Sequence, residues 1–213
     1  MKKMLWVFDL DNTLHDATPH IFPHINRSMT AYLQQYLQLD LAAANALRMH
    51  YWRRYGATLG GLMRHHNTLP AHFLWHTHQF PELESMVLRR PRLRHVLKAL
   101  PGRKVVFSNA PQHYAKAVLK LLNIEDLFDD LMAVEQTRYR PKPDNYGYLR
   151  LLKRHRVAAA QCIMVEDSLE NLRAAKRLGM RTVWVKRGSK GAPCADAVIG
   201  DVMQLPRVLQ HFF

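Results

Sequence analysis

Short apolar runs separated by amphipathic segments constrain the possible folds of this chain most strongly. The runs lie at about residues 4–8, 104–107, 131–134, 162–165 and 181–185. Between the later runs, apolar residues recur at helical spacing in HYAKAVLKLLNI, NYGYLRLLKRH and LENLRAAKRLGM. Strands that alternate with helices in this way are typical of a parallel sheet covered on both faces. The sequence therefore predicts an α/β fold.

The interval between the first and second apolar runs carries no strand pattern. Helical spacing appears instead in INRSMTAYLQQYLQL, DLAAANALRMHYWRRY and LPAHFLWHTHQF, with breaks at YGATLGGL and NTLP. We predict an all-helical insertion at residues 16–88, and an α/β domain built from residues 1–15 and 89–213. Ligands of open parallel sheets bind beyond the carboxyl ends of the strands. Because the insertion begins at such an end, we expect it to cover the site as a cap.

Composition favours an anionic small ligand. Lys and Arg number 31 against 17 acidic residues, for a formal charge of +14, and such a surface attracts anions. The densest basic segments, RRPRLRH and KRLGMRTVWVKRGSK, lack the interleaved aromatics of a base-stacking platform, so no stable nucleic-acid complex is expected. No apolar run approaches the ~20 residues of a membrane span, and the two cysteines form no CxxC motif. We expect a cytoplasmic protein, monomeric or homodimeric.

Polar residues follow several of the predicted strands. A pair of aspartates alone is a weak signal, because a strand-end aspartate commonly makes an Asx turn. Here a hydroxyl with an amide, a lysine between two prolines, and further carboxylates follow later in the chain. In order, the set is Asp9 and Asp11, Ser108 and Asn109, Lys142, and Glu166, Asp167 and Asn171. All are expected to converge where the sheet opens.

This ordered set (DxDxT, Ser-Asn, Lys and EDSxxN) resembles the haloacid dehalogenase superfamily of phosphotransferases over the whole chain. The resemblance implies a Rossmann-like core, with a parallel sheet flanked by helices, and an inserted all-helical cap. It also implies Mg2+ held by the side chains of Asp9 and Asp167 and by the backbone carbonyl of Asp11. Glu166 stands where many relatives have glycine or aspartate, and Asn171 where many have aspartate, so a metal role for either stays open.

The residues predict phosphoryl transfer through an aspartyl-phosphate. A carboxylate and a phosphomonoester dianion repel each other, and a hard cation such as Mg2+ removes that repulsion. Asp9 is then the nucleophile, and Asp11 protonates the leaving oxygen and later deprotonates water. Ser108, Asn109 and Lys142 are expected to bind the phosphoryl oxygens. Because dehalogenases and phosphonatases of this superfamily lack the second aspartate, Asp11 favours phosphomonoester chemistry.

Two segments narrow the expected substrate. FSNAPQHYAKAVLKLLNIEDLFDDL and RRYGATLGGLMRHH are similar to segments of the pyrimidine 5′-nucleotidases of this superfamily. The similarity implies a nucleoside 5′-monophosphate, with pyrimidine bases preferred, as the small phosphorylated metabolite. His15, Tyr55 and Thr58 are the candidate contacts to the leaving group.

Three alternatives stay open at the level of sequence. The first is a phosphatase for sugar phosphates or other small phosphomonoesters, and the second is a sugar phosphomutase. The third is a protein without activity that uses this fold to bind anions or nucleic acid. Histidine pairs with a spacing of four, His20 with His24 and His72 with His76, have no obvious third ligand, so a solvated basic face is favoured over a zinc site.

Overall fold

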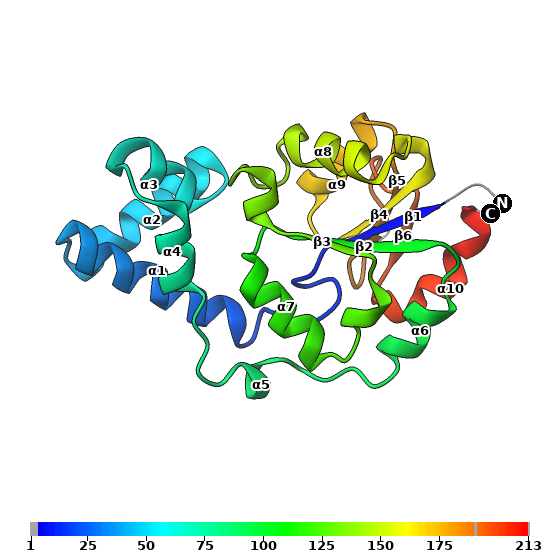
Figure 1. The fold of residues 1–213 in the computed structure, drawn as a ribbon, viewed down its shortest axis with the longest axis horizontal. Helices are drawn as coiled ribbons and strands as arrows, with labels where there is room; N and C mark the ends of the chain where they lie inside the picture. Colours follow the sequence, from blue (N-terminus) through cyan, green and yellow to red (C-terminus); the bar gives the residue numbers. More distant parts are fainter. Residues whose placement is uncertain (1–3, 190, 213) are drawn as a thin grey trace.

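The computed structural model describes residues 4–189 and 191–212 (Figure 1). Its centre is a six-stranded sheet with the order β3-β2-β1-β4-β5-β6, in which every neighbouring pair is parallel. The strands are β1 (Leu5–Phe8), β2 (Arg103–Phe107), β3 (Asp130–Met132), β4 (Cys162–Glu166), β5 (Arg181–Val185) and β6 (Ala197–Ile199). The predicted α/β fold is confirmed. The sequence reading missed β6, because three residues are too short for a periodic signal.

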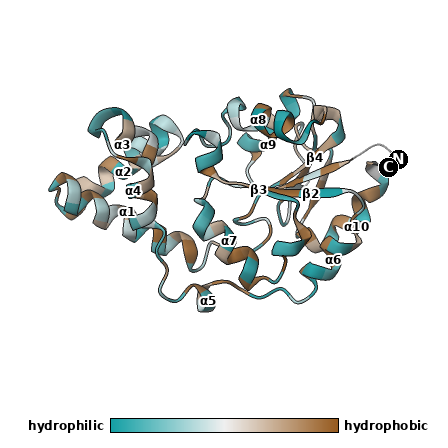
Figure 2. Ribbon diagram, in the orientation of Figure 1, coloured by the Kyte–Doolittle hydropathy of each residue, from teal (hydrophilic) through white to brown (hydrophobic). Residues whose placement is uncertain are grey.

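The first strand lies in the middle of the sheet. It pairs with β2 on one side and with β4 on the other, so its residues are buried on both faces. Figure 2 shows mainly brown, hydrophobic colour in the interior of the sheet, which agrees with this burial. Asp9 extends the ladder by one residue, since its N–H donates to the Val165 carbonyl at 3.0 Å. The acidic motif therefore begins at the central carboxyl end of the sheet.

Helices cover both faces of the sheet (Figure 1). Trp6 and Phe8 pack in a cluster with α6 (Leu93–Ala99), α7 (Gln112–Leu121) and α10 (Leu205–Val208). Leu5 and Val7 point to the other face, against α8 (Asn145–His155) and α9 (Leu169–Arg177). Short 3-10 helices lie at Glu125–Leu127, Val134–Thr137, Ala159–Gln161, Val202–Gln204 and Leu209–His211. The one at Val134–Thr137 replaces the end of the strand that the apolar run at 131–134 predicted.

Four helices form a separate bundle beside the sheet. They are α1 (Ile21–Leu37), α2 (Leu41–Tyr55), α3 (Thr58–His66) and α4 (Pro70–Thr77), and they pack around the fully buried Leu33, Leu62 and Phe73. The short α5 (Leu83–Met86) lies in the segment that returns to the sheet (Figure 1). The boundaries of the inserted segment at residues 16 and 88 stay a prediction. Ile21, Ile25 and Val87, which lie inside these bounds, pack in the same hydrophobic cluster as Trp6 and Phe8 of the sheet. No helix within residues 4–189 and 191–212 is long and apolar enough to cross a membrane.

The helix break predicted at YGATLGGL is shorter than expected and covers only the two residues between α2 and α3. Gly56, with φ of 76°, ends α2 and donates its N–H to the Trp52 carbonyl at 2.9 Å, and α3 already begins at Thr58. Gly61 lies inside α3 because it contacts the ring of Tyr51, where a Cβ would overlap the ring atoms. Packing between α2 and α3 therefore overrides the low helix propensity of the two glycines.

Gly61→Ala is expected to lower the free energy of unfolding by roughly 1–3 kcal/mol, because the added methyl overlaps the Tyr51 ring. Gly60→Ala is the comparison variant, since its Cβ would make a tight contact of 3.2 Å with the Tyr55 Cβ, whereas the Cβ at Gly61 would overlap the Tyr51 ring. Alanine also favours the helix at both positions. Urea unfolding followed by circular dichroism measures both. Equal stability of the two variants would contradict the close packing of α2 on α3.

Candidate active site

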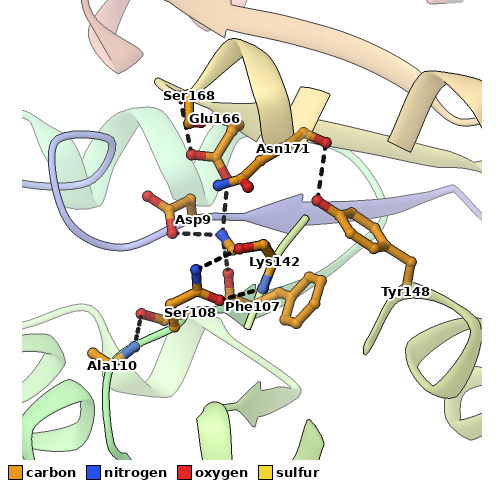
Figure 3. Close-up of polar contacts among 10 residues, drawn as sticks. Asp9, Phe107, Ser108, Ala110, Lys142, Tyr148, Glu166, Ser168 and Asn171 are labelled. Carbon is orange, nitrogen blue, oxygen red and sulfur yellow. Dashed lines mark hydrogen bonds and ion pairs between the residues drawn. The ribbon is translucent and has the colours of Figure 1, made fainter. Parts of the chain in front are cut away.

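The buried ammonium of Lys142 lies at the centre of the site. Its Nζ donates to Asp9 Oδ1 at 2.7 Å, to Glu166 Oε2 at 2.7 Å and to the Phe107 carbonyl at 2.8 Å (Figure 3). The residue is only 3% exposed. Because an ammonium has three N–H bonds, these three acceptors use all of them. Lys142 thus fixes the orientation of two carboxylates that lie at the ends of neighbouring strands.

Asn109 positions Lys142 through the backbone. Its Oδ1 accepts the Lys142 N–H at 2.7 Å, and its Nδ2 donates to the Lys142 carbonyl at 3.1 Å. The side-chain amide is therefore committed to the lysine, which also lies between two prolines in the sequence. Both polar atoms of the Asn109 side chain are used in this way, so the predicted contact with phosphate would have to come from the backbone of Asn109.

Three carboxyl groups form a cluster that fits a divalent cation. Asp9, Glu166 and Asp167 each offer an oxygen, and these atoms all lie within 4.8 Å of one another. Glu166 Oε1 also accepts the Ser168 N–H at 3.2 Å. Hard carboxylate oxygens at such separations are the ligands that Mg2+ takes in proteins. The trio includes both side chains predicted to hold the metal, and it adds Glu166.

The charges of this cluster are not balanced. Burial raises the pKa of Asp9 to about 7, with the charge of Glu166 adding to the effect and Lys142 opposing it. Burial also raises the pKa of Glu166 and of Asp167. The pKa of Lys142 is raised despite its burial, because the carboxylates of Asp9 and Glu166 outweigh the loss of solvent. One ammonium thus faces three acidic groups, and a bound cation would supply the missing positive charge.

Asp11 lies in a separate hydrogen-bond group. Its Oδ1 accepts the Tyr114 hydroxyl at 2.7 Å and lies 2.8 Å from His15 Nε2. Burial, reinforced by the charge of Asp11, raises the pKa of Tyr114 above its ordinary value, so the phenol stays a neutral donor. Both contacts use the same oxygen, and Oδ2 is left without a hydrogen bond among the described residues. Asp11 is thus held with one oxygen available to a ligand.

Ser108 lies at the end of β2, and its N–H donates to the Met132 carbonyl at 2.9 Å. Its Oγ accepts the Ala110 N–H at 3.1 Å, which leaves the hydroxyl hydrogen available to a ligand. Asn171 is buried, and its carbonyl accepts the Tyr148 hydroxyl at 2.9 Å (Figure 3). The contribution of Asn171 to a metal site therefore stays open.

A cavity of about 650 Å³ separates the helical bundle from the strand ends. The core contributes Asp11, Asn109, Ala110, Val134, Tyr139, Pro141 and Ser168 to its lining. The bundle contributes Phe22, Ile25, Asn26, Met29, Arg48, Met49, Trp52, Gly56, Ala57, Thr58, Leu59, Phe73, Leu74 and His78. Most of these side chains are apolar. Large, mainly apolar pockets with a few polar groups are typical of small-molecule sites.

The three predicted leaving-group contacts occupy different places. Thr58 lines the cavity, although its hydroxyl donates to the Arg48 carbonyl at 3.2 Å. His15 is 1% exposed and lies beside Asp11, and it is absent from the cavity lining. Tyr55 is likewise absent from the lining, and its hydroxyl lies 2.6 Å from His65 Nε2. Sequence reasoning missed Tyr114, because its contact with Asp11 joins residues 103 positions apart.

Comparison with known proteins agrees with this geometry. A family model described as a haloacid dehalogenase-like hydrolase matches residues 4–179. The chain is 27% identical over 210 residues to phosphoglycolate phosphatase of Colwellia psychrerythraea, covering 88% of this chain and 86% of that one. It is 24% identical over 183 residues to the phosphorylated carbohydrates phosphatase of Thermotoga maritima, covering 84% and 82%. The crystal structure of a HAD phosphatase from Thermococcus onnurineus superposes with a TM-score of 0.69 at 21% identity, covering 97% of each chain.

Removal of the ammonium is expected to destabilise the protein. Lys142→Met leaves Asp9 and Glu166 buried without their shared partner, which should lower the free energy of unfolding by roughly 3–5 kcal/mol. Adding Glu166→Gln to Lys142→Met removes one of the two uncompensated charges and should restore part of the loss. Urea unfolding without divalent cations measures both variants. If the double variant were less stable than Lys142→Met alone, the shared ion pair would not be the cause.

Mg2+ affinity is expected to depend on pH, because Asp9 must lose a proton to bind the ion. With the pKa of Asp9 raised to about 7 by burial, affinity should be constant above pH 7 and fall by up to about tenfold per pH unit below it. Isothermal titration calorimetry at pH 6, 7 and 8 measures this dependence. Asp167→Asn should weaken binding, and Glu125→Gln, an exposed carboxylate outside the cluster, should not. Equal affinity at pH 6 and 8 would contradict the raised pKa.

Proposed function

The chain belongs to the haloacid dehalogenase-like hydrolases, and from that premise we propose that it is a Mg2+-dependent phosphomonoester hydrolase of small phosphorylated metabolites. The observation that carries the proposal is the placement of Asp9. It ends the central strand, its carboxylate is held by Lys142, and it belongs to an acidic trio that fits a divalent cation. Asp11 follows two residues later with one carboxylate oxygen available.

Asp9, Glu166 and Asp167 are the carboxylates that would hold Mg2+, with the backbone carbonyl of Asp11 as the ligand that the family resemblance adds. The ion supplies the positive charge that lets a carboxylate approach a phosphate dianion. Lys142 contributes a second positive charge from the protein itself. Because its three N–H bonds are already used, it stabilises the transferring group by charge and by keeping Asp9 in position.

Hydrolysis then proceeds in two displacements. A carboxylate oxygen of Asp9 forms a bond to phosphorus, the bond from phosphorus to the leaving oxygen breaks, and Asp11 gives its proton to that oxygen. Water next attacks the aspartyl-phosphate, and Asp11, now ionised, accepts the proton. The bond between phosphorus and Asp9 breaks, which releases inorganic phosphate and restores the enzyme. Ser108 donates its free hydroxyl hydrogen to a phosphoryl oxygen in both steps.

Tyr114 is the residue that keeps Asp11 in place for these proton transfers. Its hydroxyl holds Oδ1 from α7, on the core side, while His15 holds the same oxygen from the loop that follows β1. Both contacts restrict rotation of the carboxyl group, so that Oδ2 is the oxygen that faces the leaving group. An acid that is held in the reactive geometry lowers the entropy cost of the proton transfer.

Two leaving-group classes are candidates. Nucleoside 5′-monophosphates, with pyrimidine preferred, are supported by the segment similarities and by the rings of Phe22 and Trp52 in the cavity. Phosphoglycolate and sugar phosphates are supported by the names of the curated relatives. His78 adds no charge at neutral pH, because burial lowers its pKa to about 4. A cytoplasmic location, a monomeric or homodimeric state and the lack of a stable nucleic-acid complex stay predictions.

Phosphate release tests the proposed function. Wild-type protein is expected to release inorganic phosphate from its substrate when Mg2+ is present, and EDTA is expected to stop this release. Asp9→Asn should lower kcat by roughly 10⁴-fold or more, because the nucleophile is removed. Asp11→Asn should lower kcat by roughly 10²- to 10⁴-fold, because the acid is removed. The substrates to be tested are CMP, UMP, phosphoglycolate, glucose 6-phosphate and p-nitrophenyl phosphate. Glu125→Gln is the control variant and should keep wild-type activity.

The competing functions give different results. A phosphomutase would convert one sugar phosphate into its isomer while little inorganic phosphate accumulates. A protein without activity would release no phosphate, and its binding of nucleic acid would fall steeply with salt. Retention of full activity in Asp9→Asn would refute the aspartyl-phosphate mechanism.

A further inference from the structure

Arg48 is the one cationic side chain of Lys or Arg type in the described lining of the cavity. It projects from α2 of the helical bundle, while the catalytic carboxylates lie at the strand ends of the core. No carboxylate of the described residues lies within ion-pair distance of it, although these residues form eleven such pairs elsewhere. Asp11, the acidic residue of the lining, is engaged with Tyr114 and His15.

The hydrogen bonds of Arg48 leave one edge of its guanidinium without an acceptor. Nη1 donates to Asn26 Oδ1 at 2.8 Å. Nε is buried and has no hydrogen-bond partner, and the described residues accept no hydrogen bond from Nη2. An unpaired buried donor is unfavourable, so a ligand that supplies acceptors here gains hydrogen bonds that the described residues do not make. Nε and Nη2 form the edge that donates two parallel hydrogen bonds to a matched pair of acceptors.

We propose that Arg48 is a specificity-determining residue that binds two adjacent acceptor atoms at the end of the leaving group far from the phosphate. The inference rests on the proposed function and identifies the part of the substrate that the helical bundle reads. The acceptor pair belongs either to a carboxylate or to the acceptor edge of a nucleobase, such as O2 and N3 of cytosine. Both present the same geometry to the fork of an arginine.

The apolar surroundings increase the selectivity of this contact. The apolar side chains of Met29, Met49, Trp52 and Phe73 line the same cavity. In such surroundings a charge-assisted hydrogen bond is stronger than in water, and a ligand without the matching acceptors leaves the guanidinium unpaired. Asn26 keeps the guanidinium in one orientation, so the pair of donors is in place before the ligand arrives.

Two pairs of substrates test the proposal, and in each pair only the first member offers two adjacent acceptors without a donor between them. CMP offers O2 and N3 as adjacent acceptors, whereas UMP carries N–H at position 3 and a carbonyl in place of the amino group at position 4. Phosphoglycolate offers a carboxylate, whereas 2-hydroxyethyl phosphate carries a neutral alcohol in its place. Values of kcat and KM are measured for wild type, Arg48→Gln and Arg53→Gln. Arg53 is an exposed arginine of the same helix whose side chain makes no hydrogen bond to the described residues, which makes it the matched control.

In the wild type, kcat/KM is expected to favour the first member of one pair by roughly 10- to 100-fold, the range expected for hydrogen bonds to a charged group. Arg48→Gln should bring that ratio close to one through a higher KM for the first member, with the second member little changed. Arg53→Gln should keep the wild-type ratio. The pair that responds identifies the source of the acceptors, a nucleobase or a carboxylate.

Arg48→Lys provides a second variant if Arg48→Gln is poorly folded, because it keeps the charge and loses the two-donor edge. The proposal is overturned if both ratios are unchanged in the Arg48 variants, or if both members of each pair lose activity equally, which would indicate a structural role. If wild type hydrolyses none of the four esters nor p-nitrophenyl phosphate, the proposed function fails on its own. Calorimetric binding of cytidine against uridine, and of glycolate against ethylene glycol, then decides the role of Arg48 by the same ratios.

Discussion

The buried ammonium of Lys142 is the interaction on which the site depends. A charge removed from water is stable only when it is paired and hydrogen-bonded, and Lys142 meets this condition by contacting Asp9, Glu166 and a backbone carbonyl at once. The same contacts fix the carboxylate of Asp9 and connect the ends of β1, β2 and β4. Because the cluster holds three acidic groups and one ammonium, the site keeps a negative excess that suits a divalent cation.

The proposed chemistry and the proposed recognition of the leaving group belong to different parts of the chain. In the proposed mechanism, the strand ends supply the nucleophile, the acid and the charges that meet the phosphoryl group. The two central strands that end there, β1 and β4, are buried on both faces. The helical bundle supplies most of the cavity lining and its arginine. This arrangement lets the leaving group be recognised without altering the groups that react with phosphorus. It also explains why family membership identifies the reaction more directly than the substrate.

Sequence reasoning found the residues whose signal is local. Asp9, Asp11 and Asp167 follow apolar runs, so they could be placed at or just beyond strand ends from their neighbours alone, and Lys142 stood out because it lies between two prolines. The strand β6 and the start of α3 were missed because short or glycine-containing elements are held by packing that leaves no periodic pattern. The actual positions of His15 and Tyr55, outside the cavity lining, were equally invisible to local reasoning.

The sequence by itself determined the parallel α/β fold and the order of the catalytic motifs, because strand period, helix period and strand-end polar residues are properties of adjacent positions. Only the tertiary structure decided which groups share hydrogen bonds. Two contacts join residues from distant elements: Asn109 binds the backbone of Lys142, and Tyr114 donates to Asp11. The packing of distant elements likewise leaves the Nε of Arg48 buried without a partner. Such contacts depend on how helices and strands pack in space, and no spacing along the chain encodes them.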